Sequence, residues 1–259
     1  MPFVSPEIFA KQTIASLQEY SILSWRAIAN LFSRPRYWAD IYTQMDSIGV
    51  GSMPIVVLTG FFTGCVLALQ SATSLEAFGS VSLTGNLAAL SMVKELGPVL
   101  TGLMVSGRNA SGMASEIGSM RVTEQIDAMR ALGTDPVRKL VTPRLYATVF
   151  MLFFLTIVSD AVGIAGGALV SVTLMGLNAS SYFHNSYRAL QYGDVVQGLT
   201  KPLFSGFIIA TVGCFFGMTT KGGTQGVGKA TTQAVVYSSV FIIIVDFIVS
   251  RAMIGIFGR

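Results

Sequence analysis

Five stretches of the chain are apolar over a length sufficient to cross a membrane, and they carry few charged side chains. A helix needs about 20 mostly apolar residues to span the hydrocarbon core of a bilayer. The pattern predicts spanning helices over residues 48–72, 83–107, 145–177, 202–220 and 230–257. Because the number of spans is odd, we expect the two ends of the bundle on opposite sides of the membrane.

The segment before these spans, residues 1–46, is amphipathic. At about 100° per residue, one helical face is apolar, with Ala10, Ile14, Leu17, Trp25, Ile28 and Phe32. The opposite face is polar, so we expect a helix that lies in the membrane interface and ends at Pro35. An ordinary helix packed on the rest of the protein is the alternative. The predicted division is an N-terminal interfacial segment, residues 1–46, and a five-span unit, residues 47–259.

The composition is that of a polytopic membrane protein. Of 259 residues, 52% are hydrophobic and 12% are charged, whereas a soluble domain has about 25% charged residues. The mean hydropathy is +0.63. This disfavours a soluble enzyme and a disordered chain. Cys65 and Cys214 lie in apolar runs without metal-ligand spacing, so we expect neither a disulfide framework nor a metal site.

The distribution of lysines and arginines predicts the orientation. Twelve precede the first span or lie between spans two and three or spans four and five, and four lie on the other side, including Arg188 and Lys201. Basic loops favour the cytoplasm. We therefore expect the loop over residues 108–144 in the cytoplasm and the C-terminus on the far side. In a membrane protein, the net charge of +4 fits such loops better than nucleic-acid binding.

Four charged residues stand out within the predicted spans: Lys94, Glu95, Asp160 and Asp246. Charge inside a membrane is costly, so such side chains usually face a cavity or one another. For Asp160 and Asp246, structural pairing is at least as good an interpretation as ligand contact. For Lys94 and Glu95 we favour a cavity; a purely structural ion pair, or a position near the headgroups, is the alternative.

Apolar and polar side chains alternate near the outer end of the first span, shortly before this charged pair. Apolar walls suit the tails of an amphiphilic ligand, and a polar patch suits its headgroup. The candidate ligand-binding residues are Leu67, Gln70, Leu75, Phe78, Lys94 and Glu95.

The loop over residues 108–144 contains a predicted amphipathic helix, residues 121–132. A short helix of this kind suits docking into a groove on another protein. A helix lying flat on the lipid is the alternative, but the acidic Glu124 and Asp127 fit poorly against an anionic leaflet. The candidate docking residues are Arg121, Glu124, Gln125, Asp127 and Met129.

Motifs for catalysis are weak. Residues 223–230 resemble a P-loop but have Ala230 where a Ser or Thr should hold magnesium, and we interpret them as a flexible basic turn. The single histidine, His184, has no partner spacing. Neither GxSxG nor HExxH occurs. We therefore expect neither an enzyme nor a cofactor bound to this chain.

Three GxxxG patterns occur within predicted spans, at residues 60–64, 163–167 and 213–217. This spacing permits helices to approach closely, either within one chain or between two copies. Glycine is common in membrane helices, so the pattern alone does not decide between the two.

Several blocks of sequence resemble the MlaE permease family. They read ELGPVLTGLMVSGR at residues 95–108, ASEIGSMRVTEQIDAM at 114–129, DP at 135–136 and PR at 143–144. The resemblance runs from the interfacial helix to Asp246. Members of this family serve bacterial ABC transporters that partner MCE proteins.

The resemblance implies a homodimer in the bacterial inner membrane. A separate MlaF-like ATPase, which binds the ATP and magnesium, would dock at residues 121–132 and carry a MlaB-like STAS-domain protein. A MlaD-like hexamer of MCE domains would sit on the periplasmic side. Phospholipid would bind between the two copies near Leu67, Leu75, Phe78, Lys94 and Glu95, although some relatives have tyrosine at position 78 and arginine is common at position 94.

The resemblance therefore predicts a permease subunit that moves phospholipid between the inner and outer membranes and maintains outer-membrane lipid asymmetry. The alternative is an ion-coupled secondary transporter of a lipophilic substrate that uses Asp160, Glu95 and Asp246 as a relay. Internal repeats, frequent in such transporters, are not evident. A passive scaffold for the hexamer is a third hypothesis.

Overall fold

The computed structural model describes residues 6–31 and 37–257, and these residues form helices and short connections without a strand. The longer helices are α1 (Pro6–Leu31), α2 (Trp38–Glu76), α7 (Thr142–Thr173), α9 (Tyr192–Met218) and α10 (Gly223–Phe257). The shorter ones are α3 (Thr84–Ser91), α4 (Gly97–Val105), α5 (Ser111–Val122), α6 (Gln125–Ala131) and α8 (Ala179–Ala189). The predicted all-α fold is confirmed.

Within the described residues, five helical runs are long and apolar enough to cross a membrane, as predicted. They cover Trp38–Glu76, Val81–Val122, Val137–Thr173, Tyr192–Met218 and Gly223–Ile256. The second run is continuous because a 3-10 turn, η1 (Val81–Leu83), and two π-helical turns, η2 (Met92–Leu96) and η3 (Ser106–Ala110), join α3, α4 and α5 end to end. A third π-helical turn, η4 (Val137–Val141), leads into α7.

The runs extend beyond the predicted apolar limits. α2 begins at Trp38, ahead of residue 47, and the second run continues past residue 107 to Val122. The first half of the expected loop over residues 108–144 is therefore helical. Residues from Gly223 onward form the start of α10, so the expected flexible turn there is wrong. Helices continue where backbone hydrogen bonds can continue, whether or not the side chains are apolar.

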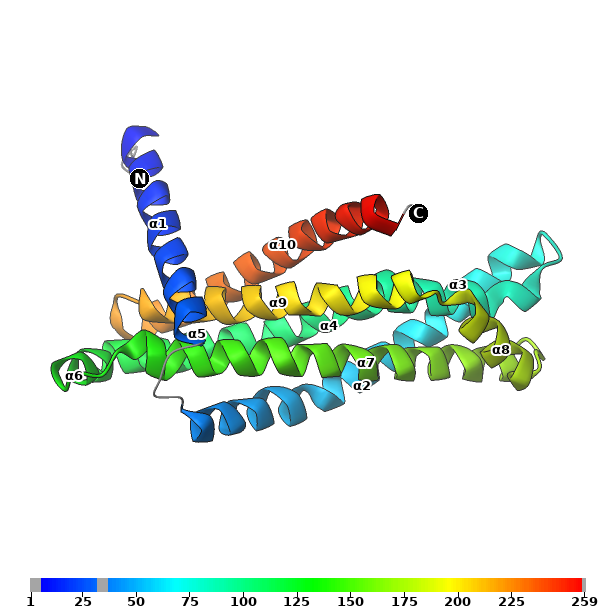
Figure 1. Cartoon of the computed structure of the whole chain (residues 1–259), viewed down its shortest axis with the longest axis horizontal. Coiled ribbons are helices and arrows are strands. Elements are labelled where there is room, and N and C mark those ends of the chain that lie inside the picture. The colour runs from blue at the N-terminus through cyan, green and yellow to red at the C-terminus, as the bar shows by residue number, and fades with distance from the viewer. Residues whose placement is uncertain (1–5, 32–36, 258–259) are drawn as a thin grey trace.

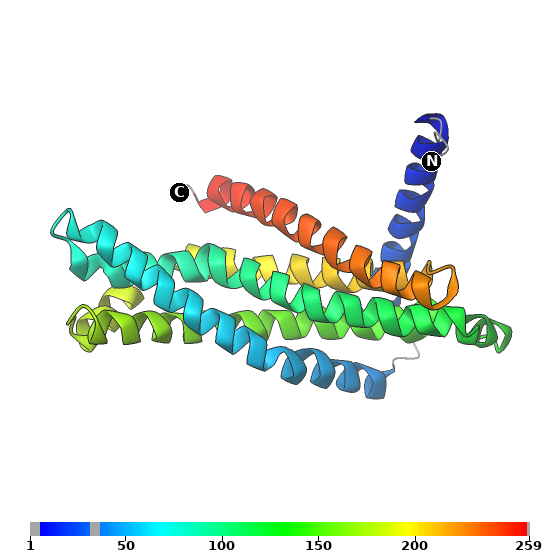
Figure 2. The same cartoon turned by 180° about the vertical axis from the view of Figure 1, so that it is seen from behind.

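α2, α7, α9 and the run from α3 to α5 lie along the long axis of the molecule (Figures 1 and 2). α6 lies at one end of this bundle and α8 at the other, while α1 projects sideways from the bundle near the α6 end. α10 diverges from the other helices towards its C-terminal end. Only 11% of its most apolar window is buried, against 61% for α9, so α9 is the central span and α10 a peripheral one.

α1 contacts the bundle with a narrow face. Leu23 and Ala27 are buried, whereas Ile14, Leu17 and Trp25 remain exposed. Ile14, Leu17 and Trp25 of the predicted interfacial face thus do not pack on the described part of the protein, whereas Ile28 is half-buried. Pro35, expected to end this helix, lies outside the described residues.

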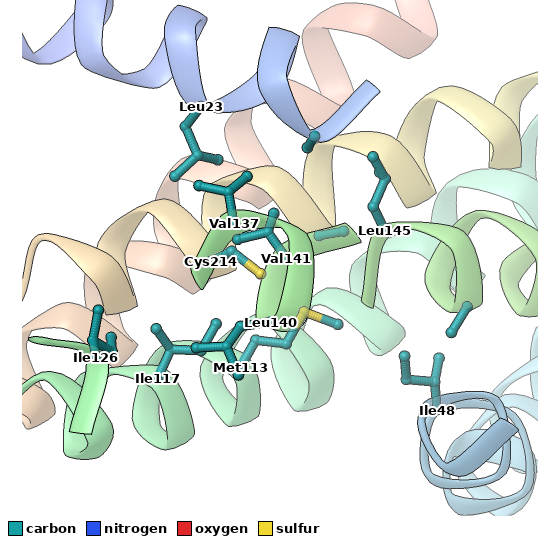
Figure 3. Close-up of a cluster of buried hydrophobic side chains, with 13 residues drawn as sticks. Leu23, Ile48, Met113, Ile117, Ile126, Val137, Leu140, Val141, Leu145 and Cys214 are labelled. Atoms are coloured by element: carbon teal, nitrogen blue, oxygen red, sulfur yellow. The ribbon is translucent and has the colours of Figure 1, made fainter. Parts of the chain in front are cut away.

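A core of buried side chains fixes α1 and α6 to the bundle near its α6 end. Leu23 of α1, Ile117 of α5, Ile126 of α6 and Val141 of η4 belong to one cluster around Cys214 of α9 (Figure 3). The thiol of Cys214 is free and buried, in keeping with its apolar surroundings. Beside this core, an apolar groove of about 790 Å³ opens between α1, α7 and α9, lined by residues such as Ile28, Phe150 and Phe207.

Glycines bring α2 and α7 into backbone contact. A Cβ atom on Gly64 would lie 1.8 Å from the carbonyl oxygen of Gly163, and one on Gly60 would lie 2.9 Å from that of Ser159. The glycines at 213 and 217 likewise face α5. The three GxxxG patterns therefore serve packing within the chain.

We predict that Gly64→Ala destabilises the protein by about 1–3 kcal/mol, because the added methyl group collides with backbone that cannot rotate away. The matched control is Gly112→Ala in α5, where a Cβ atom meets nothing within 4 Å. Thermal unfolding of the purified chain in detergent measures both. Equal melting temperatures for the two variants would contradict the close α2–α7 packing.

Candidate functional site

Five ionisable side chains from three helical segments meet inside the bundle: Lys94 and Glu95 of η2, Asp194 and Lys201 of α9, and Asp246 of α10. We call this group the charged cluster. Two ion pairs have N–O distances of 2.9 Å, between Lys94 and Asp194, and 3.0 Å, between Lys201 and Asp246. Lys201 also pairs with Glu95.

The π-helical turn η2 presents a backbone acceptor to Lys201. In an α-helix the carbonyl of Lys94 would accept from the N–H of Pro98, but proline has no N–H. The carbonyl oxygen of Lys94 is therefore available to Lys201, whose Nζ donates to it over 2.8 Å. The turn is π-helical because the N–H of Gly97 bonds to the carbonyl of Met92, five residues earlier. π-helical turns inside α-helices often mark functional positions.

The ammonium of Lys201 donates to the carbonyl of Lys94 and to the carboxylate of Glu95, and it forms an ion pair with Asp246. Oδ1 of Asp246 has no hydrogen-bond partner among the described residues, so its contact with Lys201 is one of charge. The side chain of Lys201 is only 2% exposed. A buried charge is tolerated only when it is paired and hydrogen-bonded in this way.

Glu95 is held on both oxygen atoms. Gln197 donates to Oε1 over 3.0 Å, and Ser250 of α10 lies 3.3 Å from each oxygen. The carboxylate nevertheless remains 44% exposed, and Lys94 remains 26% exposed. The charged cluster therefore has a buried side centred on Lys201 and an accessible side formed by Lys94 and Glu95.

The α9 residues of this cluster are not among the site residues predicted from the sequence. The predicted loop position of Lys201 is wrong, because the residue lies inside α9. The spacing of polar residues in the sequence does indicate this part of the site. Asp194, Gln197 and Lys201 follow one another at i, i+3 and i+7 and so share a helical face. Apolar content alone began the span too late, at Pro202, and hid this polar stripe.

Asp160 lies apart from these ion pairs. It is buried on α7 beside the start of α4, where a Cβ atom on Gly97 would lie 1.7 Å from its Oδ1. Its Oδ1 atom has no hydrogen-bond partner among the described residues. The structure thus joins Glu95 and Asp246 through Lys201, but it does not join Asp160 to them.

The predicted ligand-binding residues of the first span lie near the C-terminal end of α2. Leu67 and Leu75 are half-buried, Gln70 is exposed, and Phe78 in the following turn is 81% exposed. The polar contacts of Lys94 and Glu95 run to α9 and α10 instead of α2. A shared ligand cavity formed by all six residues stays a prediction.

The predicted docking segment forms two helices that meet at a sharp turn. Glu124 has a φ of 60°, which is uncommon for a residue with a side chain, and it separates α5 from α6. Arg121 therefore belongs to α5. Asp127 accepts from Arg121 over 2.6 Å and from Arg130 over 3.2 Å. The contact between Asp127 and Arg121 holds α6 against α5.

The outer surface of this turn is open. Glu124 and Gln125 are exposed, as is Leu132, at 83%. Ile126 is buried and Met129 packs against the core, which fixes α6 to the bundle. Met129 therefore anchors α6, while the accessible surface at the two ends of α6 is formed by Glu124, Gln125 and Leu132. Docking at this surface stays a prediction.

Among the described residues, no group of three or more His, Cys, Asp or Glu side chains is placed to hold a metal ion. The acidic members of the charged cluster already have lysine partners.

We predict that Lys201→Met destabilises the protein by about 3 kcal/mol, because two carboxylates lose their cation. The value is at the low end for a broken buried pair since Glu95 can be rehydrated. Adding Glu95→Gln and Asp246→Asn should restore most of the melting temperature in detergent. Lys221→Met, at an exposed position, is the control, and a loss as large as that of Lys201→Met would contradict the cluster.

Comparisons with known proteins agree with this architecture. Residues 41–252 match the family model for Permease MlaE. A "Probable ABC transporter permease protein" of Rickettsia bellii is 42% identical over 91% of both chains. The "Intermembrane phospholipid transport system permease protein MlaE" of Haemophilus influenzae is 32% identical over 95% of both chains. The chloroplastic protein TRIGALACTOSYLDIACYLGLYCEROL 1 of Arabidopsis thaliana is 36% identical over 88% of this chain and 65% of its own length. With its five apolar helical runs, the chain belongs to the MlaE permease family of multi-pass membrane proteins.

Proposed function

We propose that this permease moves phospholipid between the inner and outer membranes of a bacterium, and so maintains the lipid asymmetry of the outer membrane. The name of the Haemophilus relative, aligned over 95% of both chains, supports the substrate class. The observation that carries the proposal is the charged cluster. A half-exposed carboxylate and a partly exposed ammonium among apolar helices suit the polar headgroup of an amphiphile.

A separate ATPase supplies the energy in this proposal. The names of relatives as ABC transporter permeases imply such a partner. We place its docking surface at the turn around Glu124 and at Leu132, because these residues are exposed while the rest of α6 is anchored. The ATPase would bind the ATP and magnesium. The α6 end of the bundle, with its basic residues, would face the cytoplasm, and the C-terminus would face the periplasm.

One continuous helical run links the docking surface to the charged cluster. From Glu124, α5 leads back through η3 and α4 to η2, which carries Lys94 and Glu95. Arg144 of α7 pairs with Glu116 of α5 over 2.7 Å, and Arg108 of η3 donates to the carbonyl of Ser47 on α2 over 2.9 Å. A push on α6 would therefore move this run against α2 and α7.

The charged cluster would respond because its partners lie on different helices. Lys201 belongs to α9 and Asp246 to α10, while Lys94 and Glu95 belong to the moving run. A shift of η2 relative to α9 would break or remake ion pairs in discrete steps, since packed interiors switch between arrangements instead of deforming smoothly. We infer that this exchange exposes Glu95 and Lys94 to the headgroup in one state and withdraws them in the other.

The remaining partners are proposed from the family. A second copy of the chain would cover the accessible side of the charged cluster, which otherwise exposes charge at membrane depth. A MlaD-like MCE hexamer would receive or deliver lipid at the α8 end, and a MlaB-like protein would bind the ATPase. The ion-coupled alternative fits less well, because Asp160 lies outside the ion pairs that join Glu95 and Asp246.

We predict that Glu124→Arg combined with Leu132→Glu weakens co-purification of the ATPase by at least about tenfold, the loss expected when central interface residues are replaced. Arg188→Glu, an exposed charge reversal at the opposite end of the bundle, should leave the ATPase bound. Retention of the ATPase by the double variant would refute docking at α6.

Reconstitution with the partner proteins tests the transport itself. We expect ATP-dependent transfer of labelled phospholipid between two vesicle populations, and no transfer when the ATPase carries an inactive nucleotide site. Movement of substrate by the permease alone on a proton or sodium gradient would favour the ion-coupled alternative and overturn the proposal.

A further inference from the structure

The short helix α8 joins the end of α7 to the start of α9, at the end of the bundle opposite α6 (Figure 1). Asn178 caps it, since its side chain accepts from the N–H of Ser180 over 2.8 Å. α8 has no acidic residue and contains one arginine, Arg188. The proposed transport function does not draw on this element.

One face of α8 is fixed to the bundle. Tyr182 and Ser186 are buried, and the hydroxyl of Ser186 donates to the carbonyl of Gly85 on α3 over 3.1 Å. The side-chain amide of Asn185 donates to the carbonyl of Ser82 over 2.9 Å. These contacts set the rotation of α8 about its own axis, so the directions of its other faces are determined.

An aromatic flank lies next to this buried face. At about 100° per residue, Phe183 and Tyr187 fall within about 40° of each other. They are 50% and 81% exposed. Ser181 and Arg188 fall on the flank opposite the aromatic one and are exposed. α8 thus has three faces: one packed on protein, one aromatic and one polar.

We propose that α8 lies in the headgroup layer of the leaflet at its end of the bundle, with Phe183 and Tyr187 in contact with phospholipid. Aromatic side chains favour this layer, where the ring is apolar and its edge is wet. The inference rests on membrane embedding and not on the identity of the transported substrate. It can therefore be tested independently of the proposed function.

Continuity with the membrane-facing surface supports lipid as the occupant. The residue directly after α7 and the first residue of α9 also have large exposed side chains, with Leu174 at 71% and Tyr192 at 82%. The charge is complementary as well, since Arg188 can approach lipid phosphates and α8 offers no carboxylate to repel them. An acidic protein partner would have only this single cation to bind.

With α8 in the headgroup layer, the adjacent end of the helical run that carries Lys94 and Glu95 would be fixed relative to the membrane. Through Ser82 and Gly85, α8 holds the stretch that leads into α3, and α3 leads directly into η2 with Lys94 and Glu95. An anchor at the membrane surface would therefore set the depth of the charged cluster while the α6 end moves.

Single tryptophan reporters test the position of α8. The two native tryptophans, Trp25 and Trp38, are first replaced by phenylalanine in the full chain. Phe183→Trp and Tyr187→Trp then report on the aromatic flank, and Ser181→Trp on the polar face is the matched control. Each variant is placed in nanodiscs of phosphatidylcholine with or without bromine on the acyl chains near the headgroup.

We expect brominated lipid to remove about half or more of the emission of Phe183→Trp and Tyr187→Trp, because a ring at headgroup level contacts the upper acyl chains. Their emission should also be blue-shifted. Ser181→Trp should resist brominated lipid and be quenched by aqueous iodide. All three sites lie on exposed positions, and melting temperatures matching the tryptophan-free parent would verify folding.

Equal quenching of all three variants by iodide, with none by brominated lipid, would overturn the proposal and place α8 in water. Protection of the two aromatic-flank reporters from both quenchers, seen only in the complex with the partner proteins, would also overturn it and identify a protein-docking surface. Quenching by brominated lipid that persists in the complex would support the proposal in the assembled transporter.

Discussion

A buried ammonium sets the main constraint on this structure. Lys201 lies in the central span α9, where its side chain is buried and its charge must be compensated by protein atoms. The compensation comes from the carbonyl and carboxylate of η2 and from Asp246 of α10. Three helical segments are therefore held in register by one side chain, and the peripheral span α10 is tied to the bundle where it would otherwise diverge.

The local backbone of η2 follows from this constraint. Pro98 removes the N–H that would bind the carbonyl of Lys94, and the π-helical turn adjusts the helix so that this oxygen reaches Lys201. Gly198 of α9 permits the approach, since a Cβ atom there would lie 2.0 Å from the carbonyl oxygen of Val93. A proline, a glycine and a lysine that look unrelated in sequence thus form one packing arrangement.

The same helical run connects the two ends of the molecule. It begins beside α8, carries the accessible charges in its first half and ends at the turn before α6. The glycine contacts between α2 and α7 are rigid backbone contacts, so these two helices form a frame against which the run can shift. This division into frame and moving part gives a physical basis for transmitting force from a docked ATPase to a lipid headgroup.

The sequence by itself determined the number of spans, the helical class and the presence of costly charges at Lys94, Glu95, Asp160 and Asp246, because hydropathy and charge are properties of short contiguous segments. The blocks from Glu95 to Arg144 also indicated the family. Helix ends were less predictable, since Trp38 and Val122 lie in polar sequence where only backbone hydrogen bonding continues the helix.

Tertiary structure alone decided which charges pair. Lys201 and Glu95 are 106 positions apart, and no local pattern can show that α9 and η2 pack with these faces together, or that Asp160 is left outside their network.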